Sequence, residues 1–225
     1  MSETVPENLK ARVKASYDAI ADAYAERFTK EDDPVRLRYI RHLIEHFRKE
    51  ATSVNVLELG CGSGIPATKY MLQNESPKIT VTGNDISTAQ LKLARSNLAA
   101  YKDRVTLLEN DMLGLDFPST TFDAVTGFYS IIHLPREEQT QLMKKVFAWL
   151  KPGGYFLANF AVEEAATHEI KDWMQHEKGW MFWSGWGTEG SLKMVEELGM
   201  EVLLQEELEE VADATFLWIL ARKPT

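Results

Sequence analysis

The stretch Val54-Asn-Val-Leu-Glu-Leu-Gly-Cys-Gly-Ser-Gly64 decides the fold. Its first residues include alternating and β-branched apolar side chains, which predicts a buried strand, and a helical pattern resumes at Ala67. Glycines between a strand and a helix let the backbone turn sharply and come close to a ligand, and the helix start offers free N–H groups. The sequence therefore predicts a ligand-binding loop over residues 58–64.

The glycine spacing and two acidic residues narrow the class of ligand. A dinucleotide site has the spacing G-x-G-x-x-G, because the helix start must meet a pyrophosphate, whereas this loop reads Gly60-x-Gly62-x-Gly64. Glu58 beside the loop would repel phosphates and attract an ammonium group. The strand-like segment 78–85 ends in Asp85, which is placed to accept hydrogen bonds from a ribose diol. A nucleoside with an amino-acid tail meets these constraints, whereas a nicotinamide dinucleotide does not.

These motifs resemble those of the class I S-adenosylmethionine-dependent methyltransferases of the small-molecule type. The resemblance covers nearly the whole chain, and it extends to the motifs ENDM at 109–112, FDAVTGFYSIIHLP at 122–135 and LKPGGY at 150–155. It implies S-adenosyl-L-methionine as cofactor and S-adenosyl-L-homocysteine as product, with methyl transfer to an O, N or S atom of a small-molecule acceptor. The implied fold is α/β and Rossmann-like, with a seven-stranded sheet that is mostly parallel with an antiparallel last strand, helices on both faces and an N-terminal helical cap.

Alternating patterns along the chain predict the same architecture. After two helices within residues 6–50, broken near 30–34, strands are expected at 54–59, 78–84, 104–109, 122–128, 154–161, 200–208 and 214–221, and helices at about 64–73, 87–101, 136–149 and 189–198. We expect one domain over 1–225, formed by a helical cap (1–50), a cofactor-binding core (51–161), an aromatic substrate lid (162–188) and a C-terminal helix with an antiparallel strand pair (189–225).

The predicted cofactor residues lie in the glycine loop, at strand ends and on the first helix. Tyr17 and Tyr24 either close over the cofactor, as the resemblance implies, or only pack their helix on the core. Asp111 and Met112 are expected to hold the adenine, with Ile86 and Gln90 beside it. The full set is Tyr17, Tyr24, Glu58, Gly60, Cys61, Gly62, Gly64, Asp85, Ile86, Gln90, Asp111, Met112 and Phe128.

The segment 173–186 is a compositional outlier, because four of the six tryptophans in the chain lie within it. Glycines interrupt any regular periodicity there, and aromatic side chains among adaptable glycines suit a pocket wall better than a core. Plain packing is the alternative. The predicted substrate-binding residues are Trp173, Trp180, Phe182, Trp183 and Trp186.

Two residues that follow the strand predicted at 122–128 are candidates for the chemistry. His133, with an ordinary pKa of about 6.5, is suited to take a proton from an attacking oxygen or protonated amine. It alternatively only fixes the loop before the next helix. Tyr129 is expected beside the transferring methyl group. Some acceptors need no base, because alignment and exclusion of water supply much of the acceleration.

Composition limits the partners. The net charge is −9, and no stripe of Lys and Arg interleaves with aromatic residues, so nucleic acid is not expected as a partner. The only cysteine is Cys61, the N-terminal MSETVPENLK has no targeting pattern, and no apolar run approaches the ~20 residues of a membrane span. We expect a cytoplasmic monomer or homodimer without a membrane partner.

Two further hypotheses follow from the sequence. His42 and His46 lie four residues apart on one predicted helix, but no third ligand with a known spacing accompanies them, so no metal site is expected. The alternative function is a catalytically silent cofactor-binding subunit that acts through a protein partner. The tryptophan-rich segment would then be an exposed apolar surface.

Overall fold

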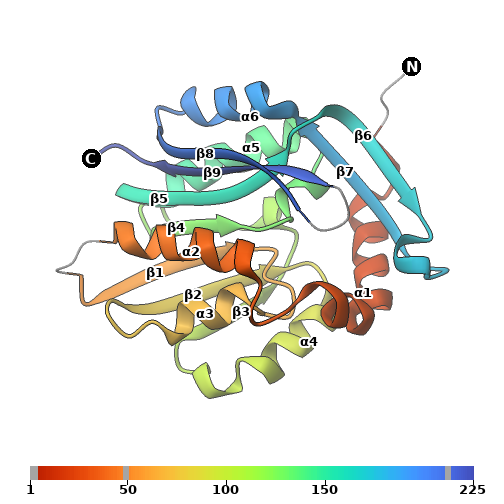
Figure 1. Cartoon of the computed structure of the whole chain (residues 1–225), viewed down its shortest axis with the longest axis horizontal. Helices are drawn as coiled ribbons and strands as arrows, with labels where there is room; N and C mark the ends of the chain where they lie inside the picture. The colour runs from red at the N-terminus through yellow and green to blue at the C-terminus, as the bar shows by residue number, and fades with distance from the viewer. Residues whose placement is uncertain (1–4, 48–50, 211–213) are drawn as a thin grey trace.

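The computed structural model describes residues 5–47, 51–210 and 214–225, and its centre is one seven-stranded sheet (Figure 1). The strand order is β3 (Val105–Glu109), β2 (Lys78–Asp85), β1 (Ser53–Leu59), β4 (Phe122–Gly127), β5 (Leu150–Ala161), β9 (Thr215–Arg222) and β8 (Glu201–Glu209). Strands β1 to β5 pair in parallel, and β9 is antiparallel to both β5 and β8. The predicted fold class is confirmed.

Helices cover both faces of this sheet. The helices are α1 (Leu9–Phe28), α2 (Pro34–His46), α3 (Ala67–Gln73), α4 (Thr88–Asn97), α5 (Arg136–Trp149) and α6 (Gly187–Glu196), with short 3-10 turns η1 (Ala99–Tyr101), η2 (Met112–Gly114), η3 (Ile131–His133) and η4 (Trp173–Gln175). Alternate residues of β1 face opposite layers: Val54 and Val56 pack with α2 and α3, whereas Leu57 and Leu59 pack with α5 and α6. Burial on both sides explains why the strands read as apolar runs.

The tryptophan-rich segment differs from the prediction. Strands β6 (Glu164–Lys171) and β7 (Trp180–Trp186) form a separate two-stranded antiparallel hairpin, where no strand was predicted. Residues on both sides of β7 are buried, so the sequence WMFWSGW carries no alternation of apolar and polar side chains that would reveal a strand. The hairpin is therefore regular structure, although the glycines suggested otherwise.

Other boundaries shift for local reasons. The helix predicted from 64 begins at Ala67 because Pro66 occupies its N-cap position, and the helix predicted over 87–101 divides into α4 and η1. The helix predicted from 189 begins at Gly187, and β5 begins at Leu150. Of the predicted cap 1–50, residues 1–4 and 48–50 lie outside the described residues.

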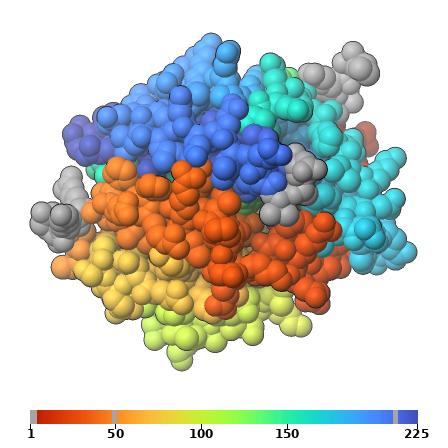
Figure 2. All heavy atoms as spheres, in the orientation of Figure 1, coloured from red at the N-terminus to blue at the C-terminus, as the bar shows by residue number. Residues whose placement is uncertain are grey.

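Helix α1 and the β6–β7 hairpin lie against each other at one end of the molecule (Figures 1 and 2). Their contact has a small apolar core of its own, formed by Leu9 and Val13 of α1 with Trp180 and Phe182 of β7. The backbone N–H of Trp180 donates to the hydroxyl of Ser16 at 2.8 Å, and Ser16 is fully buried. Within the described ranges, no helix is long and apolar enough to cross a membrane.

Candidate cofactor and substrate site

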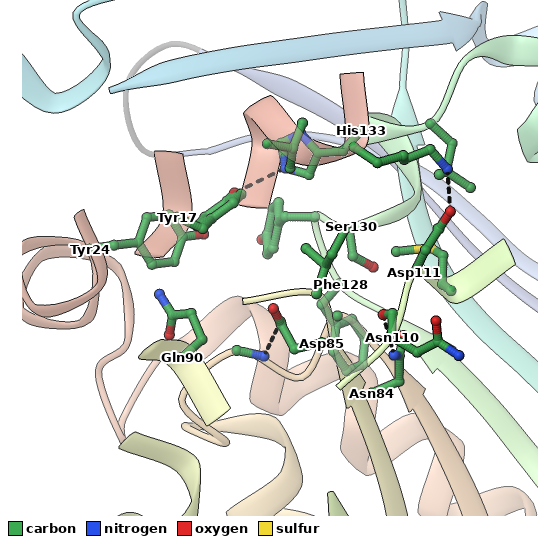
Figure 3. A pocket seen from close by; sticks show the side chains of 18 residues that line it. Tyr17, Tyr24, Asn84, Asp85, Gln90, Asn110, Asp111, Phe128, Ser130 and His133 are labelled. Carbon is green, nitrogen blue, oxygen red and sulfur yellow. Dashed lines mark hydrogen bonds and ion pairs between the residues drawn. The ribbon is translucent and has the colours of Figure 1, made fainter. Parts of the chain in front are cut away.

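A cavity that is open to solvent lies at the carboxyl ends of β1, β2, β3 and β4, and α1 forms one of its walls. Figure 3 shows its side chains pointing inward from these separate elements. Its lining residues are Lys10, Val13, Tyr17, Tyr24, Gly60, Gly62, Asn84, Asp85, Ile86, Gln90, Asn110, Asp111, Met112, Phe128, Tyr129, Ser130, His133 and Leu134.

Asp85, at the end of β2, links the glycine loop to α4. One carboxylate oxygen accepts from the backbone N–H of Gly62 at 2.8 Å (Figure 3). The other accepts from the backbone N–H of Ser87, also at 2.8 Å. Ser87 in turn caps α4 by accepting from the backbone N–H of Gln90 at 3.1 Å. Burial raises the pKa of Asp85 to about 6, against the pull of these two hydrogen bonds. The carboxylate is fixed in place and faces the cavity.

Gln90 provides an independent sign of a polar ligand. Its side chain is 2% exposed and lines the cavity, and both its amide nitrogen and its amide oxygen lack a hydrogen-bond partner. An unpaired buried amide costs free energy, so such a group is normally paired when its site is filled. Gly62 has φ 54°, and a Cβ there would meet only the Gln90 amide oxygen, at 3.7 Å. The cavity is therefore open beside a carboxylate and a free amide, which suits a ribose.

Three predicted cofactor residues support the glycine loop and do not line the cavity. Glu58 is buried and accepts from the Thr68 hydroxyl at 2.5 Å, and burial raises its pKa to about 7. Cys61 donates its backbone N–H to Asn84 at 2.8 Å, and burial raises the pKa of its thiol. Gly64 has φ 76° with the Leu98 side chain 2.7 Å from where a Cβ would lie. Direct cofactor contacts of these residues remain predictions.

Asp111 already has partners in this structure. One carboxylate oxygen accepts from Lys10 at 2.8 Å (Figure 3). The other accepts from the backbone N–H of Leu113 at 3.1 Å. Lys10 also pairs with Glu138 at 2.6 Å, so α1 is joined to two other elements at this corner of the cavity. The predicted hydrogen bond between Asp111 and the adenine amine stays a prediction. The amine would either share the Asp111 carboxylate with Lys10 or displace Lys10 from it.

His133 is held in one tautomer by its neighbours. Its Nδ1 lies 2.8 Å from the backbone carbonyl oxygen of Phe182, which can only accept, so Nδ1 carries the proton. Nε2 is therefore the acceptor, and it accepts a hydrogen bond from the Tyr17 hydroxyl at 3.0 Å (Figure 3). Burial lowers the pKa of His133 to about 4 and raises that of Tyr17 well above its usual range. The ordinary pKa of about 6.5 expected for His133 is therefore wrong, because burial removes the solvation that the charged ring needs. A neutral imidazole and a neutral phenol thus face the cavity.

Tyr129 and Arg36 form a second polar group at this end of the cavity. Tyr129 has φ 54°, unusual for a residue with a side chain, and its backbone N–H donates to Asn159 at 2.6 Å. Its hydroxyl donates to Glu210, and the Arg36 guanidinium lies 4.7 Å from its ring centroid. The Arg36 Nε is buried without a hydrogen-bond partner.

The predicted substrate residues divide into two groups. Trp180 and Phe182 are buried between β7 and α1. Trp186 packs on the core, and its indole N–H donates to the backbone carbonyl oxygen of Arg136 at 3.0 Å. Trp183 instead lies near His133, and Trp173 lies against Trp183. The large apolar side chains that the described residues expose are only Val5 and Leu203, so the tryptophan-rich segment is not the exposed apolar surface that a silent subunit would require.

Several residues of the site were not predicted. Lys10 and Val13 lie at helical spacing before Tyr17 and Tyr24, so the face of α1 that carries the two tyrosines was a signal for them. Arg36 gave no such signal, because only the folded chain brings α2 to the cavity. Among the described residues, no group of His, Cys, Asp or Glu could hold a metal ion. The unpredicted lining residues are Lys10, Val13, Asn84, Asn110, Ser130 and Leu134.

The sheet and its cavity define a Rossmann-like α/β protein with a cavity at the carboxyl ends of the strands, the edge at which open α/β sheets bind ligands. Residues 56–154 match a family model described as a methyltransferase domain. Over the whole fold, the chain resembles the 1,6-didemethyltoxoflavin-N1-methyltransferase of Burkholderia thailandensis, with a TM-score of 0.74, 16% identity and coverage of 99% of this chain and 92% of that one.

Two curated relatives are similar over part of their length. The demethylmenaquinone methyltransferase of Symbiobacterium thermophilum is 30% identical over 68% of this chain and 60% of its own, and the 27-O-demethylrifamycin SV methyltransferase of Amycolatopsis mediterranei is 34% identical over 44% and 35%. The alignments thus cover less than two thirds of each of these relatives. Together the comparisons confirm the resemblance to the class I S-adenosylmethionine-dependent methyltransferases, a class that uses S-adenosylmethionine.

Proposed function

We propose that the protein is an S-adenosylmethionine-dependent methyltransferase that acts on a small-molecule acceptor. The observation that carries the proposal is that one cavity is lined both by a fixed carboxylate, Asp85, and by the amide of Gln90, which has no hydrogen-bond partner. The hydroxyl groups of a ribose can donate to the Asp85 carboxylate, and they can both donate to and accept from the Gln90 amide. The same cavity has an open backbone at Gly62 and no cluster of cations for a pyrophosphate.

The chain offers a partner for each part of the cofactor. Asp85 and Gln90 would hold the ribose, and Asp111 with the backbone near Met112 would hold the adenine. The methionine end carries an ammonium and a carboxylate. The carboxylate would be attracted by Arg36, whose guanidinium contacts the cavity residue Tyr129. Tyr17 and Tyr24 would cover the cofactor from α1.

When bound, the cofactor supplies an electrophilic methyl group on a sulfonium. The residues of the chain would align the acceptor with this methyl group, exclude water and receive a proton. The cofactor would supply the methyl group and leave as S-adenosylhomocysteine, and the proton that the acceptor loses would pass to His133 Nε2, directly or through the Tyr17 hydroxyl. Because the pKa of His133 is about 4, its protonated form then releases the proton readily to water.

Ligand-dependent melting tests the cofactor class. S-adenosylhomocysteine at ~100 times its dissociation constant should stabilise the fold by about 2.7 kcal/mol, whereas NAD should not shift the melting temperature. Asp85→Ala should lose most of the shift, measured against its own melting temperature without ligand, because the backbone N–H groups of Gly62 and Ser87 lose their acceptor in this variant. Asp116→Asn is the matched control, because Asp116 is exposed and does not line the cavity. A shift with NAD and none with S-adenosylhomocysteine would reject the proposal.

A further inference from the structure

Six aromatic side chains form a closed ring of contacts, which we call the aromatic circuit. Successive centroid distances are 5.4 Å (Tyr17–Tyr24), 5.1 Å (Tyr24–Phe28), 6.3 Å (Phe28–Trp173), 5.4 Å (Trp173–Trp183), 6.5 Å (Trp183–His133) and 5.6 Å (His133–Tyr17). Three members come from α1, two from the hairpin segment and one from η3. Tyr17, Tyr24 and His133 also line the cavity (Figure 3), whereas Phe28, Trp173 and Trp183 are not lining residues and continue the ring contacts from the cavity toward the hairpin.

The circuit is not the packing that joins α1 to the hairpin. All six of its members are half-buried, whereas core aromatics such as Trp218 and Phe156 are fully buried. The buried cluster of Leu9, Val13, Trp180 and Phe182 already holds the two elements together. Large aromatic side chains that contact one another and remain partly exposed beside a cavity are typical of a binding wall.

The charges beside the circuit disfavour a cationic occupant. The Arg27 guanidinium lies 5.2 Å from the Phe28 centroid, and Arg36 lowers the pKa of Tyr24 through its charge, although burial leaves that pKa raised. The carboxylate of Glu169, in the hairpin, is engaged by the Trp180 indole N–H at 2.9 Å and faces Arg12 at 3.8 Å. Two guanidinium groups near the rings would repel an ammonium ligand.

One unpaired donor indicates what the occupant must carry. The indole N–H of Trp173 is buried and has no hydrogen-bond partner. An indole N–H can only donate, so a ligand that satisfies it must bring an oxygen or nitrogen acceptor. At the other side of the circuit, a reacting group would point toward the Tyr17 hydroxyl, which is hydrogen-bonded to His133 Nε2 at 3.0 Å.

We infer that the methyl acceptor is an uncharged, planar, conjugated molecule that carries a hydrogen-bond acceptor, held between α1 and the β6–β7 hairpin. Flat π-systems contact rings of this kind over a large area and gain stacking or edge contacts beyond simple burial. This inference rests on the proposed function, since it places the molecule beside the methyl group of the cofactor.

Calorimetry on the protein saturated with S-adenosylhomocysteine tests the inference. The probes are 2-naphthol, the saturated bicyclic alcohol 2-decalol and a naphthyl trimethylammonium cation. We expect 2-naphthol to bind at least tenfold more tightly than either of the other two. Trp173→Leu and Trp183→Leu should each weaken naphthol binding at least tenfold and leave the affinity for S-adenosylhomocysteine within twofold. Tyr101→Leu, a half-buried aromatic outside the circuit, should change neither affinity.

The outcomes separate the two proposals. Equal or tighter binding of decalol or of the cation would overturn the inferred acceptor class, as would unchanged naphthol binding in both tryptophan variants. Either result would leave cofactor binding intact. Failure of the wild-type protein to bind S-adenosylhomocysteine would reject the proposed function instead.

Discussion

At the scale of single residues, the ionisation of Asp85 links affinity to pH. Burial raises the pKa of this carboxyl to about 6, so it is largely protonated at pH 5 and ionised at pH 7. A ribose diol donates to the ionised form, so binding favours deprotonation. The dissociation constant of S-adenosylhomocysteine should therefore fall about tenfold from pH 5 to pH 7, with proton release detected by calorimetry in two buffers.

Two variants isolate this group from its neighbours. Asp85→Asn should bind S-adenosylhomocysteine more weakly by about 1.5–3 kcal/mol, and its dissociation constant should no longer change with pH below pH 6.5. Glu58→Gln is the control, because burial raises the pKa of Glu58 to about 7 but its carboxyl does not line the cavity. That variant should keep the change between pH 5 and 6.5. A pH-independent wild-type affinity would contradict the ribose role of Asp85.

The pair of Tyr17 and His133 makes a second residue-scale prediction. His133→Ala should lower the single-turnover rate of methyl transfer by roughly 10²-fold or more for an acceptor that must lose a proton. The affinity for S-adenosylhomocysteine should not change. Tyr17→Phe keeps the ring but removes the hydroxyl that donates to Nε2, so it reports whether the proton passes through Tyr17. Unaltered chemistry in His133→Ala would leave positioning alone as the source of catalysis.

These residues also show what the sequence can reveal about a site. Asp85 and the loop glycines were predictable, because the strand pattern places them at a known edge of the sheet. Arg36 was not, since its approach to Tyr129 depends on how α2 packs across β4 and β9. The tautomer of His133 depends on the backbone carbonyl of Phe182, a group that sequence patterns cannot assign to a partner.

At the scale of elements, the attachment of α1 should control access to the cavity. Ser16→Ala removes the hydroxyl that accepts the backbone N–H of Trp180 and leaves that buried N–H unpaired, at a cost of about 1–3 kcal/mol. Opening of α1 should become at least fivefold more frequent, which stopped-flow dissociation of S-adenosylhomocysteine would detect. Ala11→Ser, on the exposed side of the same helix, is the control. Equal dissociation rates in Ser16→Ala and the wild type would show that α1 does not gate the cavity.

The hairpin marks the limit of pattern reading for whole elements. Long segments buried on one or two sides of the sheet carried clear signals, and their predicted bounds differ from the observed ones by a few residues. Strand β7 carried no clear signal, because α1 buries one of its faces and the core of the sheet buries the other. Its aromatic residues then resembled an irregular wall, although only Trp173 and Trp183 belong to the aromatic circuit.

At the scale of the whole molecule, one sheet positions every part of the site. The carboxyl ends of β1, β2, β3 and β4 supply the cofactor side of the cavity, and the chain after β5 returns over that edge as the hairpin. Alternation of strands and helices predicted a parallel sheet, and right-handed crossovers bring the carboxyl ends of its strands to one edge, so the location of the cavity was predictable from the sequence although the strand order was not predicted. The positions of α1 and the β6–β7 hairpin over the cavity were not predictable, because the contact between them joins residues far apart in the chain.

Helix α1 touches both proposed occupants, and this has a consequence for events in time. Its residues Lys10 and Val13 line the cofactor side, while Tyr17, Tyr24 and Phe28 belong to the aromatic circuit. A spent cofactor could therefore leave only after the helix has moved, and the same movement would release the methylated product. We expect cofactor to bind before acceptor, and the departure rate of one helix to set the upper limit on turnover.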